Sequence, residues 1–369
     1  MLVLHIMASG ARGGGADHLL GVLPELAERE VRCVAAVGPA GPTLASLTTA
    51  GIATRSLRLM HSRLDPSAPL RLARVVRQVA PDIVHYHGTR AAYFGALARP
   101  WLPKGLKTVY TVHGMAYRQE VPPWRRALLL GAEAVACRGA DRVVSVSRTD
   151  LEDLERRGFV RPRRGAHVPN AVAAARFHGI DGRAARARMG IGRTAFVVGT
   201  VSRLVPQKAV ADLIDAVGET DGCELVIVGD GPLRPTLEAR ARPLGSRIHF
   251  LGSRSDIPEL LASFDLFVLS SRWEGEPIAL LEALAASCPV IATETEGARE
   301  ILGPTQAGVL TEVGDVSALA SAIETLRADP SRREALAARG RRAIRGRTHG
   351  RTADRLVQLY RDLLDPPPA

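Results

Sequence analysis

Short apolar runs alternate with segments of helical periodicity through the first half of the chain. This alternation predicts a parallel sheet whose crossover helices cover both faces. The predicted strands are residues 2–7, 31–37, 52–57, 83–86, 108–112 and 143–146. The predicted helices are residues 16–29, a short segment from Thr43, 69–79, a segment from Arg90, and 123–137.

The alternation breaks at Val168-Pro169-Asn170-Ala171-Val172, where a proline precedes a turn-forming asparagine. We place a domain boundary after Asn170. Strand-like runs then resume at residues 196–201, 224–228, 248–251, 266–269, 289–292 and 308–310, with helical segments between them. We therefore expect two similar α/β domains, joined by a short linker, with a cleft between their sheet edges.

Length and composition agree with two globular domains. A chain of 369 residues is too long for one typical core. Hydrophobic residues make up 46% and aromatic residues only 4%, which indicates cores of Ala, Val and Leu. The four cysteines are isolated from one another in the sequence, a pattern typical of buried thiols in a reducing compartment.

No apolar run is long enough to span a bilayer; the nearest, residues 127–137, is short and carries Glu133. The N-terminal stretch MLVLHIMASG has no basic segment before its apolar part, so we interpret it as a first strand rather than a signal peptide. We expect a cytoplasmic protein.

The net charge of +11 lies entirely in the first half. Residues 1–170 hold 24 Lys and Arg against 13 Asp and Glu, whereas the remainder is balanced at 25 of each. This asymmetry favours an anionic partner for the N-terminal half. Basic and aromatic residues are not interleaved, which argues against nucleic acid as that partner.

The most informative stretch is FDLFVLSSRWEGEPIALLE, residues 264–282. A short strand breaks into a polar loop, and Pro277 opens a helix. In a parallel sheet this turn lies at the carboxyl edge, where a helix N-terminus favours phosphate. Glu274 on the loop can reach a polar ligand, and Glu282 in the second helical turn can accept hydrogen bonds from vicinal hydroxyls.

A second strand-to-helix turn carries two cations. In TVSRLVPQK, residues 200–208, Arg203 can bind phosphate oxygens in a bidentate manner and Lys208 can add a mobile charge. Ordinary surface charge is the competing interpretation. The neighbouring carboxylate pair and a second helix start favour a diphosphate site.

Two features of the first half are weaker signals. The loop Gly10-Ala11-Arg12-Gly13-Gly14-Gly15 allows close approach of a ligand, but its glycine spacing does not match the dinucleotide fingerprint. His85, His87 and His113 stand at the ends of predicted strands, where structural histidines are also common. Zinc is a poor explanation, because matching carboxylate or cysteine ligands are missing from the sequence around them.

Taken together, these motifs resemble a retaining glycosyltransferase of family 4, group 1. The resemblance rests on residues 201–208, on Val226-Ile227-Val228-Gly229-Asp230-Gly231-Pro232 and on the spacing of Glu274 and Glu282 in the second half. In the first half it rests on Gly14-Gly15-Ala16-Asp17, His113-Gly114 and residues 168–172. It covers nearly the whole chain but does not specify the sugar.

The resemblance implies a GT-B fold, in which two Rossmann-like, doubly wound domains enclose an interdomain cleft. Residues 1–170 would bind the acceptor, residues 171–348 the nucleotide sugar, and residues 349–369 would form a C-terminal helix that crosses back to the first domain. The acceptor would be a glycan or a lipid-linked molecule of the cell envelope.

The resemblance also implies roles for single residues. Arg203 and Lys208 would bind the diphosphate, Glu282 the ribose and Glu274 the transferred sugar, while His113 would face that sugar from the other domain. The remaining donor-site residues would be Gly14, Gly15, Gly252, Arg254, Gly275, Glu276, Pro277, Ile278 and Ala279. Gly252 and Arg254 mark the backbone that recognises the base, and a UDP-sugar is favoured over a GDP-sugar.

Four positions depart from the family pattern. Ser202 and Ala209 stand where glycine is usual, and Asp17 stands where glutamate is usual. Glu276 replaces an aromatic or small residue, and its charge beside the donor would alter sugar preference. No Asp-x-Asp motif is present to hold a divalent metal, so we expect Arg203 and Lys208 to stabilise the leaving group without a metal or other cofactor.

Residues 121–130 join Trp124, Arg125 and Arg126 to an apolar helix. Such a segment can bind an anionic membrane surface, and core packing of its leucines is the competing interpretation. Binding would place the protein peripherally on the inner face of the plasma membrane.

Two other functions remain as alternatives. A nucleotide-sugar 2-epimerase shares the fold but would convert the donor without an acceptor. A non-catalytic module that binds a nucleotide sugar is the other alternative, and the presence of all four of Arg203, Lys208, Glu274 and Glu282 argues against it.

Overall fold

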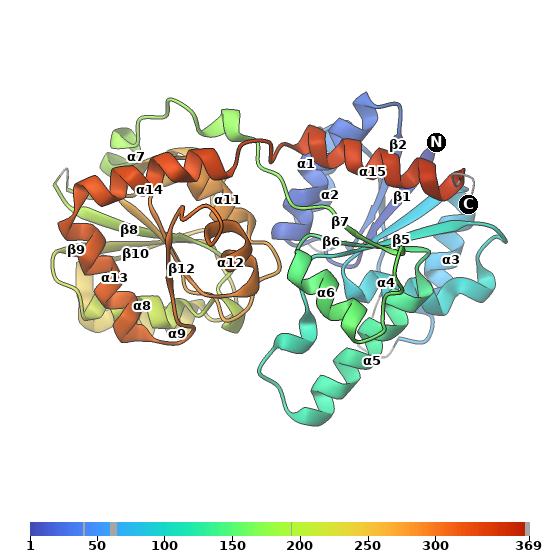
Figure 1. Cartoon of the computed structure of the whole chain (residues 1–369), viewed down its shortest axis with the longest axis horizontal. Coiled ribbons are helices and arrows are strands. Elements are labelled where there is room, and N and C mark those ends of the chain that lie inside the picture. Colours follow the sequence, from blue (N-terminus) through green and yellow to red (C-terminus); the bar gives the residue numbers. More distant parts are fainter. Residues whose placement is uncertain (40, 60–64, 193, 366–369) are drawn as a thin grey trace. The chain divides into compact units, whose positions relative to one another are not determined.

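The computed structural model describes residues 1–39, 41–59, 65–192 and 194–365 (Figure 1). The chain divides into two compact units. Unit 1 comprises Met1–Ala171 and Arg347–Ala369, and unit 2 comprises Val172–Gly346. The first boundary lies one residue from the break that the sequence indicates. The last residues of the expected C-terminal segment, 366–369, lie outside the described part.

Unit 1 alternates strands and helices and ends with the last helix of the chain. Its strands are β1 (Leu2–Met7), β2 (Arg32–Val37), β3 (Ala53–Ser56), β4 (Ile83–His87), β5 (Lys107–Val112), β6 (Arg142–Ser145) and β7 (Gly165–His167). Its α-helices are α1 (Gly14–Glu28), α2 (Thr43–Thr49), α3 (Ala68–Val79), α4 (Thr89–Ala98), α5 (Pro123–Gly139), α6 (Arg148–Arg156) and α15 (His349–Leu364).

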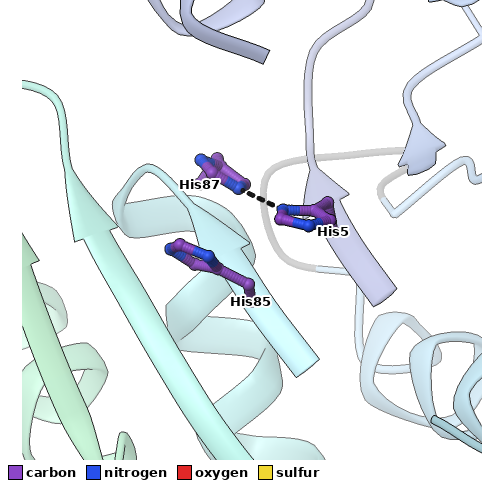
Figure 2. A group of neighbouring side chains, drawn as sticks. All are labelled: His5, His85 and His87. Carbon is purple, nitrogen blue, oxygen red and sulfur yellow. Dashed lines mark hydrogen bonds between the residues drawn. The ribbon is translucent and has the colours of Figure 1, made fainter. Parts of the chain in front are cut away.

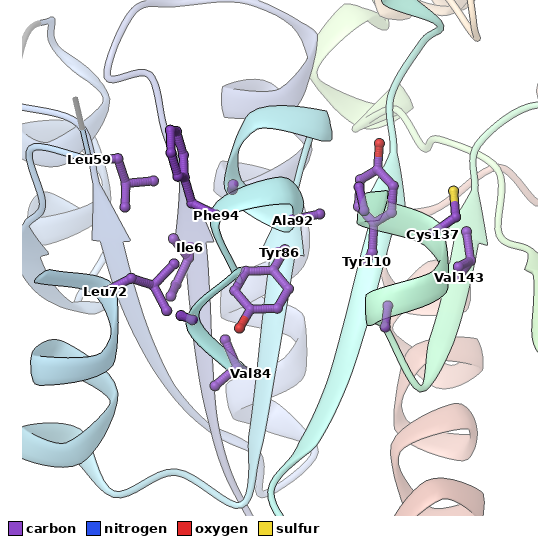
Figure 3. Packing of buried hydrophobic residues seen from close by; sticks show 14 of the residues in the cluster. Ile6, Leu59, Leu72, Val84, Tyr86, Ala92, Phe94, Tyr110, Cys137 and Val143 are labelled. Carbon is purple, nitrogen blue, oxygen red and sulfur yellow. The ribbon is translucent and has the colours of Figure 1, made fainter. Parts of the chain in front are cut away.

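The strands of unit 1 form one parallel sheet in the order β3-β2-β1-β4-β5-β6-β7. Successive side chains of a strand point to opposite faces of the sheet, so each strand supplies two cores. On one face, Ile6, Val84 and Tyr110 belong to one buried cluster with Leu72 of α3 and Phe94 of α4 (Figure 3).

The other face of this sheet is covered by α1 and α15. Val3, Ile83 and Val109 lie beneath Leu19 of α1 and Leu356 of α15 in one buried cluster. The N-terminus of α15 is capped by Thr348, whose side chain accepts a hydrogen bond from the Arg351 N–H. Helix α15 thus completes the cover of this face of unit 1.

Unit 2 repeats the architecture with one strand fewer. Its strands are β8 (Phe196–Val201), β9 (Cys223–Val228), β10 (Ile248–Gly252), β11 (Leu266–Leu269), β12 (Val290–Thr293) and β13 (Val309–Thr311). Its α-helices are α7 (Arg183–Arg188), α8 (Val210–Gly218), α9 (Arg234–Ala241), α10 (Ile257–Ser263), α11 (Ile278–Ala285), α12 (Glu296–Leu302), α13 (Val316–Ala328) and α14 (Pro330–Ala343).

The sheet of unit 2 is also parallel, in the order β10-β9-β8-β11-β12-β13. Helices α10, α11 and α12 pack on the face that carries Val226 and Phe267. Helices α8, α9 and α13 pack on the face that carries Leu225 and Val268. From β8 the chain adds β9 and β10 on one side and then β11, β12 and β13 on the other side. In open α/β sheets ligands bind at such a switch point.

The sequence pattern missed several elements, among them α6, β7 and α7, and misplaced the start of another. Helix α6 and the short edge strand β7 lie in the polar stretch before the domain boundary, where the apolar pattern is weak. Pro277 is the N-cap of α11, with extended backbone, rather than its first helical residue. None of the described helices is both long and apolar enough to cross a membrane.

Candidate functional site

The two polar turns singled out in the sequence meet at the carboxyl edge of the unit 2 sheet. One follows β8 and contains Arg203 and Lys208, and the other follows β11 and contains Glu274. Because β8 and β11 are hydrogen-bonded neighbours, their C-terminal connections emerge side by side. The fold therefore brings together residues that stand far apart in the sequence.

Lys208 and Glu274 are in direct contact. The Lys208 Nζ donates a hydrogen bond to Glu274 Oε1, and the Ser271 hydroxyl donates to the same oxygen at 2.6 Å. The two charged side chains are only 16% and 7% exposed. Burial makes both charges costly unless they are paired, so each holds the other in place.

Backbone contacts fix the geometry around this ion pair. The Arg272 N–H donates to the Gln207 carbonyl oxygen at 2.8 Å, and the Gln207 amide donates to the Trp273 carbonyl oxygen at 2.8 Å. The Ser270 hydroxyl donates a hydrogen bond to the Ala209 carbonyl oxygen at 3.1 Å. The two connections thus form one hydrogen-bonded layer.

Arg203 lies on the same connection as Lys208 but is exposed. Its neighbours are held tightly, because the Ser202 N–H donates to the Val228 carbonyl oxygen and the Leu204 N–H donates to the Asp230 carbonyl oxygen, both at 2.9 Å. A Cβ atom at residue 229 would lie 1.8 Å from the Ser202 carbonyl oxygen, so only glycine fits there. The Arg203 backbone is fixed while its side chain remains accessible.

Ala209 has left-handed backbone, with φ 44° and ψ 41°. This is the position where the family pattern has glycine. A Cβ atom in this conformation costs about 1 kcal/mol. Alanine in place of glycine at residue 209 therefore strains the backbone directly after Lys208.

The start of α11 carries the remaining predicted residues. Gly275, Glu276 and Pro277 are buried, whereas Ile278, Ala279 and Glu282 are half-buried. A Cβ atom at Gly297, in the first turn of α12, would lie 1.9 Å from the Gly275 carbonyl oxygen. The loop before α11 is therefore packed closely against the next helix.

Gly252 is the last residue of β10 and Arg254 follows it, farther along this edge and two strands from β8. The Gly252 carbonyl oxygen accepts the Gly229 N–H at 2.8 Å and so joins the layer that holds Arg203. Arg254 is paired with Asp256 through two bonds of 2.6 and 2.8 Å.

The predicted residues of the first half lie together in unit 1. Gly14 and Gly15 begin α1, and a Cβ atom at Gly15 would stand 3.6 Å from His113 Cδ2. His113 follows β5 and is half-buried. Its Nε2 is 3.3 Å from His87 Nδ1, a hydrogen bond between two rings.

Sequence reasoning missed two further histidines of this cluster, His5 on β1 and His18 on α1. His5 Nδ1 is 3.1 Å from His87 Nε2 (Figure 2), and His18 Nδ1 bonds the Asn170 Oδ1 at 3.1 Å. The position of His5 in its strand could have revealed it, because His5 and His85 occupy paired positions of neighbouring strands. All five rings lie on the face covered by α1 and α15.

Burial keeps these histidines neutral. It lowers the pKa of His5 to about 3 and that of His18 to about 4, and it holds the pKa values of His85, His87 and His113 well below the usual 6.5. Neighbouring imidazoles lower them further.

Three of these rings meet a geometric condition for metal ligation. One ligand nitrogen each of His5, His85 and His87 lies within 4.8 Å of the others. Hydrogen bonds compete with ligation at these nitrogens, because His5 Nδ1 and His87 Nε2 bond each other at 3.1 Å. His85 also uses both nitrogens, which lie 2.6 Å from the Tyr360 and Thr111 hydroxyls.

Comparison with known proteins matches the two units to two family models. Residues 12–176 match the model "Glycosyltransferase Family 4", and residues 182–343 match "Glycosyl transferases group 1". Together these matches contain the Gly14 loop, the histidine that follows β5 and the paired connections after β8 and β11.

Curated relatives cover most of the chain. It is 32% identical over 302 residues to the GDP-mannose-dependent alpha-mannosyltransferase of Mycobacterium tuberculosis, spanning 79% of this chain and 75% of that protein. It is 29% identical over 270 residues to the Escherichia coli UDP-Gal:alpha-D-GlcNAc-diphosphoundecaprenol alpha-1,3-galactosyltransferase, spanning 70% of each.

A solved structure confirms the fold class. The Anabaena protein Alr3699/HepE in complex with UDP-glucose has a TM-score of 0.85 over 97% of this chain and 99% of that one, at 24% identity. The expectation of two Rossmann-like domains of the GT-B type is thus confirmed.

Proposed function

The chain belongs to the group 1, family 4 glycosyltransferases, and we propose that it is a retaining enzyme that moves a hexosyl unit from a nucleotide sugar to a glycan or lipid-linked acceptor. The observation that carries this proposal is the Lys208–Glu274 contact beside the Arg203 loop. It joins a phosphate-binding cation to a sugar-binding carboxylate at the switch point of one sheet. The product would enter cell-envelope polysaccharide or glycolipid synthesis.

Cleavage of the bond between the anomeric carbon and the diphosphate leaves negative charge on the phosphate oxygen and positive charge on the sugar. Arg203 and Lys208 would stabilise the leaving diphosphate, and Glu274 would orient the sugar hydroxyls. Glu282, in the second turn of α11, would accept hydrogen bonds from the ribose. His113 would contact the sugar from unit 1.

The donor base differs between relatives of this chain. One relative uses UDP-Gal and another depends on GDP-mannose, so family membership admits both bases. We favour UDP. A thermal-shift screen of UDP, GDP, ADP and their sugars would decide, because a ligand at 100 times its dissociation constant stabilises the folded protein by about 2.7 kcal/mol.

We further propose that no metal takes part in the reaction. Two cations at the diphosphate can supply the charge that magnesium supplies elsewhere. Transfer to a lipid-linked acceptor should therefore proceed in EDTA at the rate seen with added Mg²⁺. Activity that disappears in EDTA and returns with Mg²⁺ would contradict the proposal.

Two assays separate the alternatives. Donor incubated without acceptor should remain unchanged, whereas a 2-epimerase would convert it. Anomeric analysis of the product should show retention, and an inverted product would reject the mechanism. Binding of a nucleotide sugar with neither transfer nor epimerisation over a panel of envelope acceptors would favour a non-catalytic module.

The acceptor proposal includes a membrane surface. The start of α5 and the loop before it project from unit 1 (Figure 1). Trp124 and Leu128 on this segment are 67% and 66% exposed, and Arg125 and Arg126 lie between them. Exposed apolar side chains next to cations are typical of segments that bind anionic lipid. We place the enzyme in the cytoplasm, peripherally on the inner membrane face.

A further inference from the structure

Charge is unevenly distributed along the sequence of unit 2. Residues 172–329 contain 15 Lys and Arg against 21 Asp and Glu, a net charge of −6, whereas residues 330–346 contain six Arg against one Glu, a net charge of +5. The second range is helix α14 with the residues that follow it in unit 2. The balanced total of the second half of the chain therefore combines an acidic body with one basic helix.

One side of α14 is anchored in unit 2. Leu336 is buried in the cluster on one face of the sheet, and Ile344, which follows the helix, is buried in the cluster on the other face. Gly340 lies between them, where a Cβ atom would stand 2.9 Å from Leu284 Cδ2 of α11. The opposite side of α14 lies on the surface of the unit (Figure 1).

The exposed side of α14 and the turn after it carry four arginines, here called the α14 arginine group: Arg339, Arg341, Arg342 and Arg345. No Asp or Glu occurs between residues 335 and 346. Residues three or four apart are neighbours on a helix surface, so Arg339 and Arg342 repel each other. Ala335 and Ala338 occupy the positions from which a carboxylate would relieve this repulsion.

Other helices of unit 2 pair their terminal arginines. Helices α9, α12 and α13 each have one basic residue in the last turn. Each of these residues forms an ion pair: Arg240 with Asp215, Arg299 with Glu294, and Arg327 with Glu324. Among the residues that the structure describes, no member of the α14 arginine group is paired with a carboxylate.

The helix dipole explains one cation at a helix end but not this group. A helix C-terminus attracts positive charge, and one paired arginine is enough to meet that preference in α9, α12 and α13. In α14, Arg341 and Arg342 both stand in the last turn and Arg345 follows. Their unpaired guanidinium groups fit an anion that comes from outside the unit.

We infer that the α14 arginine group is a lipid-binding surface of unit 2, which holds the phosphate groups of anionic lipids at a membrane. Guanidinium groups bind phosphate oxygens in a bidentate manner. A bilayer presents many such groups in one plane, which matches a row of cations along one side of a helix. Lipid binding at α14 needs neither a sugar donor nor a transfer reaction.

The contact is electrostatic and does not insert into the bilayer. Among the described residues, α14 has no exposed large apolar side chain, whereas α5 has Trp124 and Leu128. Binding through α14 should therefore need anionic lipid and weaken as salt is added. It should contribute nothing on neutral vesicles.

The composition of the surface favours lipid over other anionic partners. Proteins that bind single-stranded nucleic acid combine cations with aromatic side chains that stack on bases, and α14 contains no aromatic residue. Protein interfaces are built around buried aromatic and apolar anchors, and the side chains between these arginines are alanines.

Vesicle flotation of the full chain measures the inference. The vesicles are phosphatidylcholine with or without phosphatidylglycerol. Arg341→Gln with Arg342→Gln and Arg345→Gln should weaken binding to the anionic vesicles about 10²-fold, since each basic residue near such a surface contributes about fivefold. The corresponding three Arg→Lys substitutions keep the charge and should retain most of the binding. Unchanged binding of the glutamine variant would overturn the inference.

A matched control removes three charges elsewhere in unit 2. Arg240→Gln with Arg299→Gln and Arg327→Gln changes the net charge by the same amount, but it removes arginines that are already paired. This variant should bind anionic vesicles nearly as well as the unsubstituted protein. Equal weakening in the two glutamine variants would show that only net charge matters, and would overturn the inference.

The α5 segment is removed so that α14 can be measured alone. In protein with Trp124→Ser, Arg125→Gln, Arg126→Gln and Leu128→Ser, binding to anionic vesicles should persist at low salt. Adding the three glutamine substitutions of the α14 arginine group should abolish it. Absence of any binding before they are added would overturn the inference, as would tighter binding of duplex DNA than of anionic vesicles through these arginines.

A transfer assay with a water-soluble acceptor separates this surface from the proposed function. The glutamine variant of the α14 arginine group should keep its turnover, because these residues lie outside the connections that follow β8 and β11. Vesicle binding through α14 in a protein that transfers no sugar would leave the inference standing and remove the transferase. Normal transfer by a protein whose vesicle binding does not depend on α14 would do the reverse.

Discussion

The ammonium of Lys208 donates to the carboxylate of Glu274, although the two residues follow different strands and stand far apart in the sequence. The pair is buried and shares its acceptor oxygen with the Ser271 hydroxyl. A nucleotide sugar that binds here would exchange part of this contact for its own phosphate and hydroxyl groups. Each residue is thereby kept near the place where a ligand would need it.

Replacing Lys208 should affect both stability and rate. Lys208→Ala leaves Glu274 buried without its cation, which should lower the free energy of unfolding by about 3 kcal/mol. It should also lower kcat by about 10²- to 10³-fold, through the lost charge at the leaving group. Urea unfolding and initial transfer rates measure the two effects. Lys208→Met combined with Glu274→Gln should recover stability but not activity.

Arg203 provides the contrast within the same connection. Because its side chain is exposed, Arg203→Ala should reduce kcat by about 10²- to 10³-fold while changing the free energy of unfolding by less than about 0.5 kcal/mol. Lys104→Ala, an exposed cation of unit 1, should change neither quantity. Near-normal turnover in Arg203→Ala would remove this residue from the diphosphate site.

Glycine at position 209 should stabilise the protein. Ala209 adopts φ 44°, and glycine reaches this region without the Cβ penalty. Ala209→Gly should therefore raise the free energy of unfolding by up to about 1 kcal/mol with turnover preserved. Ala211→Gly, two residues later inside α8, should lower it by about 0.5–1 kcal/mol. Destabilisation by both substitutions would contradict the strain at Ala209.

Acid should destabilise the protein through the histidine cluster. In the unfolded chain these rings titrate near pH 6.5, whereas burial lowers the folded pKa of His5 to about 3 and of His18 to about 4. The unfolded state therefore binds more protons below pH 6.5. Stability should be fully present above that pH and fall toward pH 4, by up to about 1.4 kcal/mol per pH unit for each ring.

Urea unfolding at several pH values between 7.5 and 5 measures this slope. Glu133, whose pKa burial raises, opposes it, because the folded state takes up that proton more readily on acidification. In His5→Phe the free energy of unfolding should depend less steeply on pH, because one of the buried rings no longer contributes. A slope that is the same in His5→Phe and in the unsubstituted protein would show that His5 is not buried in its neutral form.

Vesicle flotation tests the membrane segment. Binding to vesicles with anionic lipid should exceed binding to neutral vesicles, and Arg125→Gln with Arg126→Gln should weaken it about 30-fold, from about 1 kcal/mol per basic residue. Trp124→Ser with Leu128→Ser should weaken binding to both kinds of vesicle. Trp101→Ser, another exposed tryptophan of unit 1, is the matched control. Flotation independent of anionic lipid would remove the proposal.

The site in unit 2 was predictable because its residues follow strands. Arg203, Lys208 and Glu274 lie in connections that follow apolar runs, and parallel strands bring such connections to one edge. The contact between Lys208 and Glu274 depends on the pairing of β8 with β11. A sequence motif carries no information on which strands pair. The strain at Ala209 could be suspected only from its departure from the family pattern.

The histidine cluster was not predictable in the same way. His85 and His87 were noted, but His5 lies in an apolar strand with no polar neighbour to mark it. Its place in the cluster depends on β1 lying beside β4, which is a property of strand order. The covering helix α15 adds the Tyr360 hydroxyl on His85 from the far end of the chain.

The return of α15 to unit 1 bears on the order in which the protein is made. Unit 2 is a continuous segment inserted into unit 1, so all of its residues precede in the sequence the helix that completes unit 1. Until Leu356 and Tyr360 are synthesised, the sheet face that bears His85 has no cover from α15. Unit 1 therefore remains incomplete until residues that follow unit 2 in the sequence are available to cover its sheet.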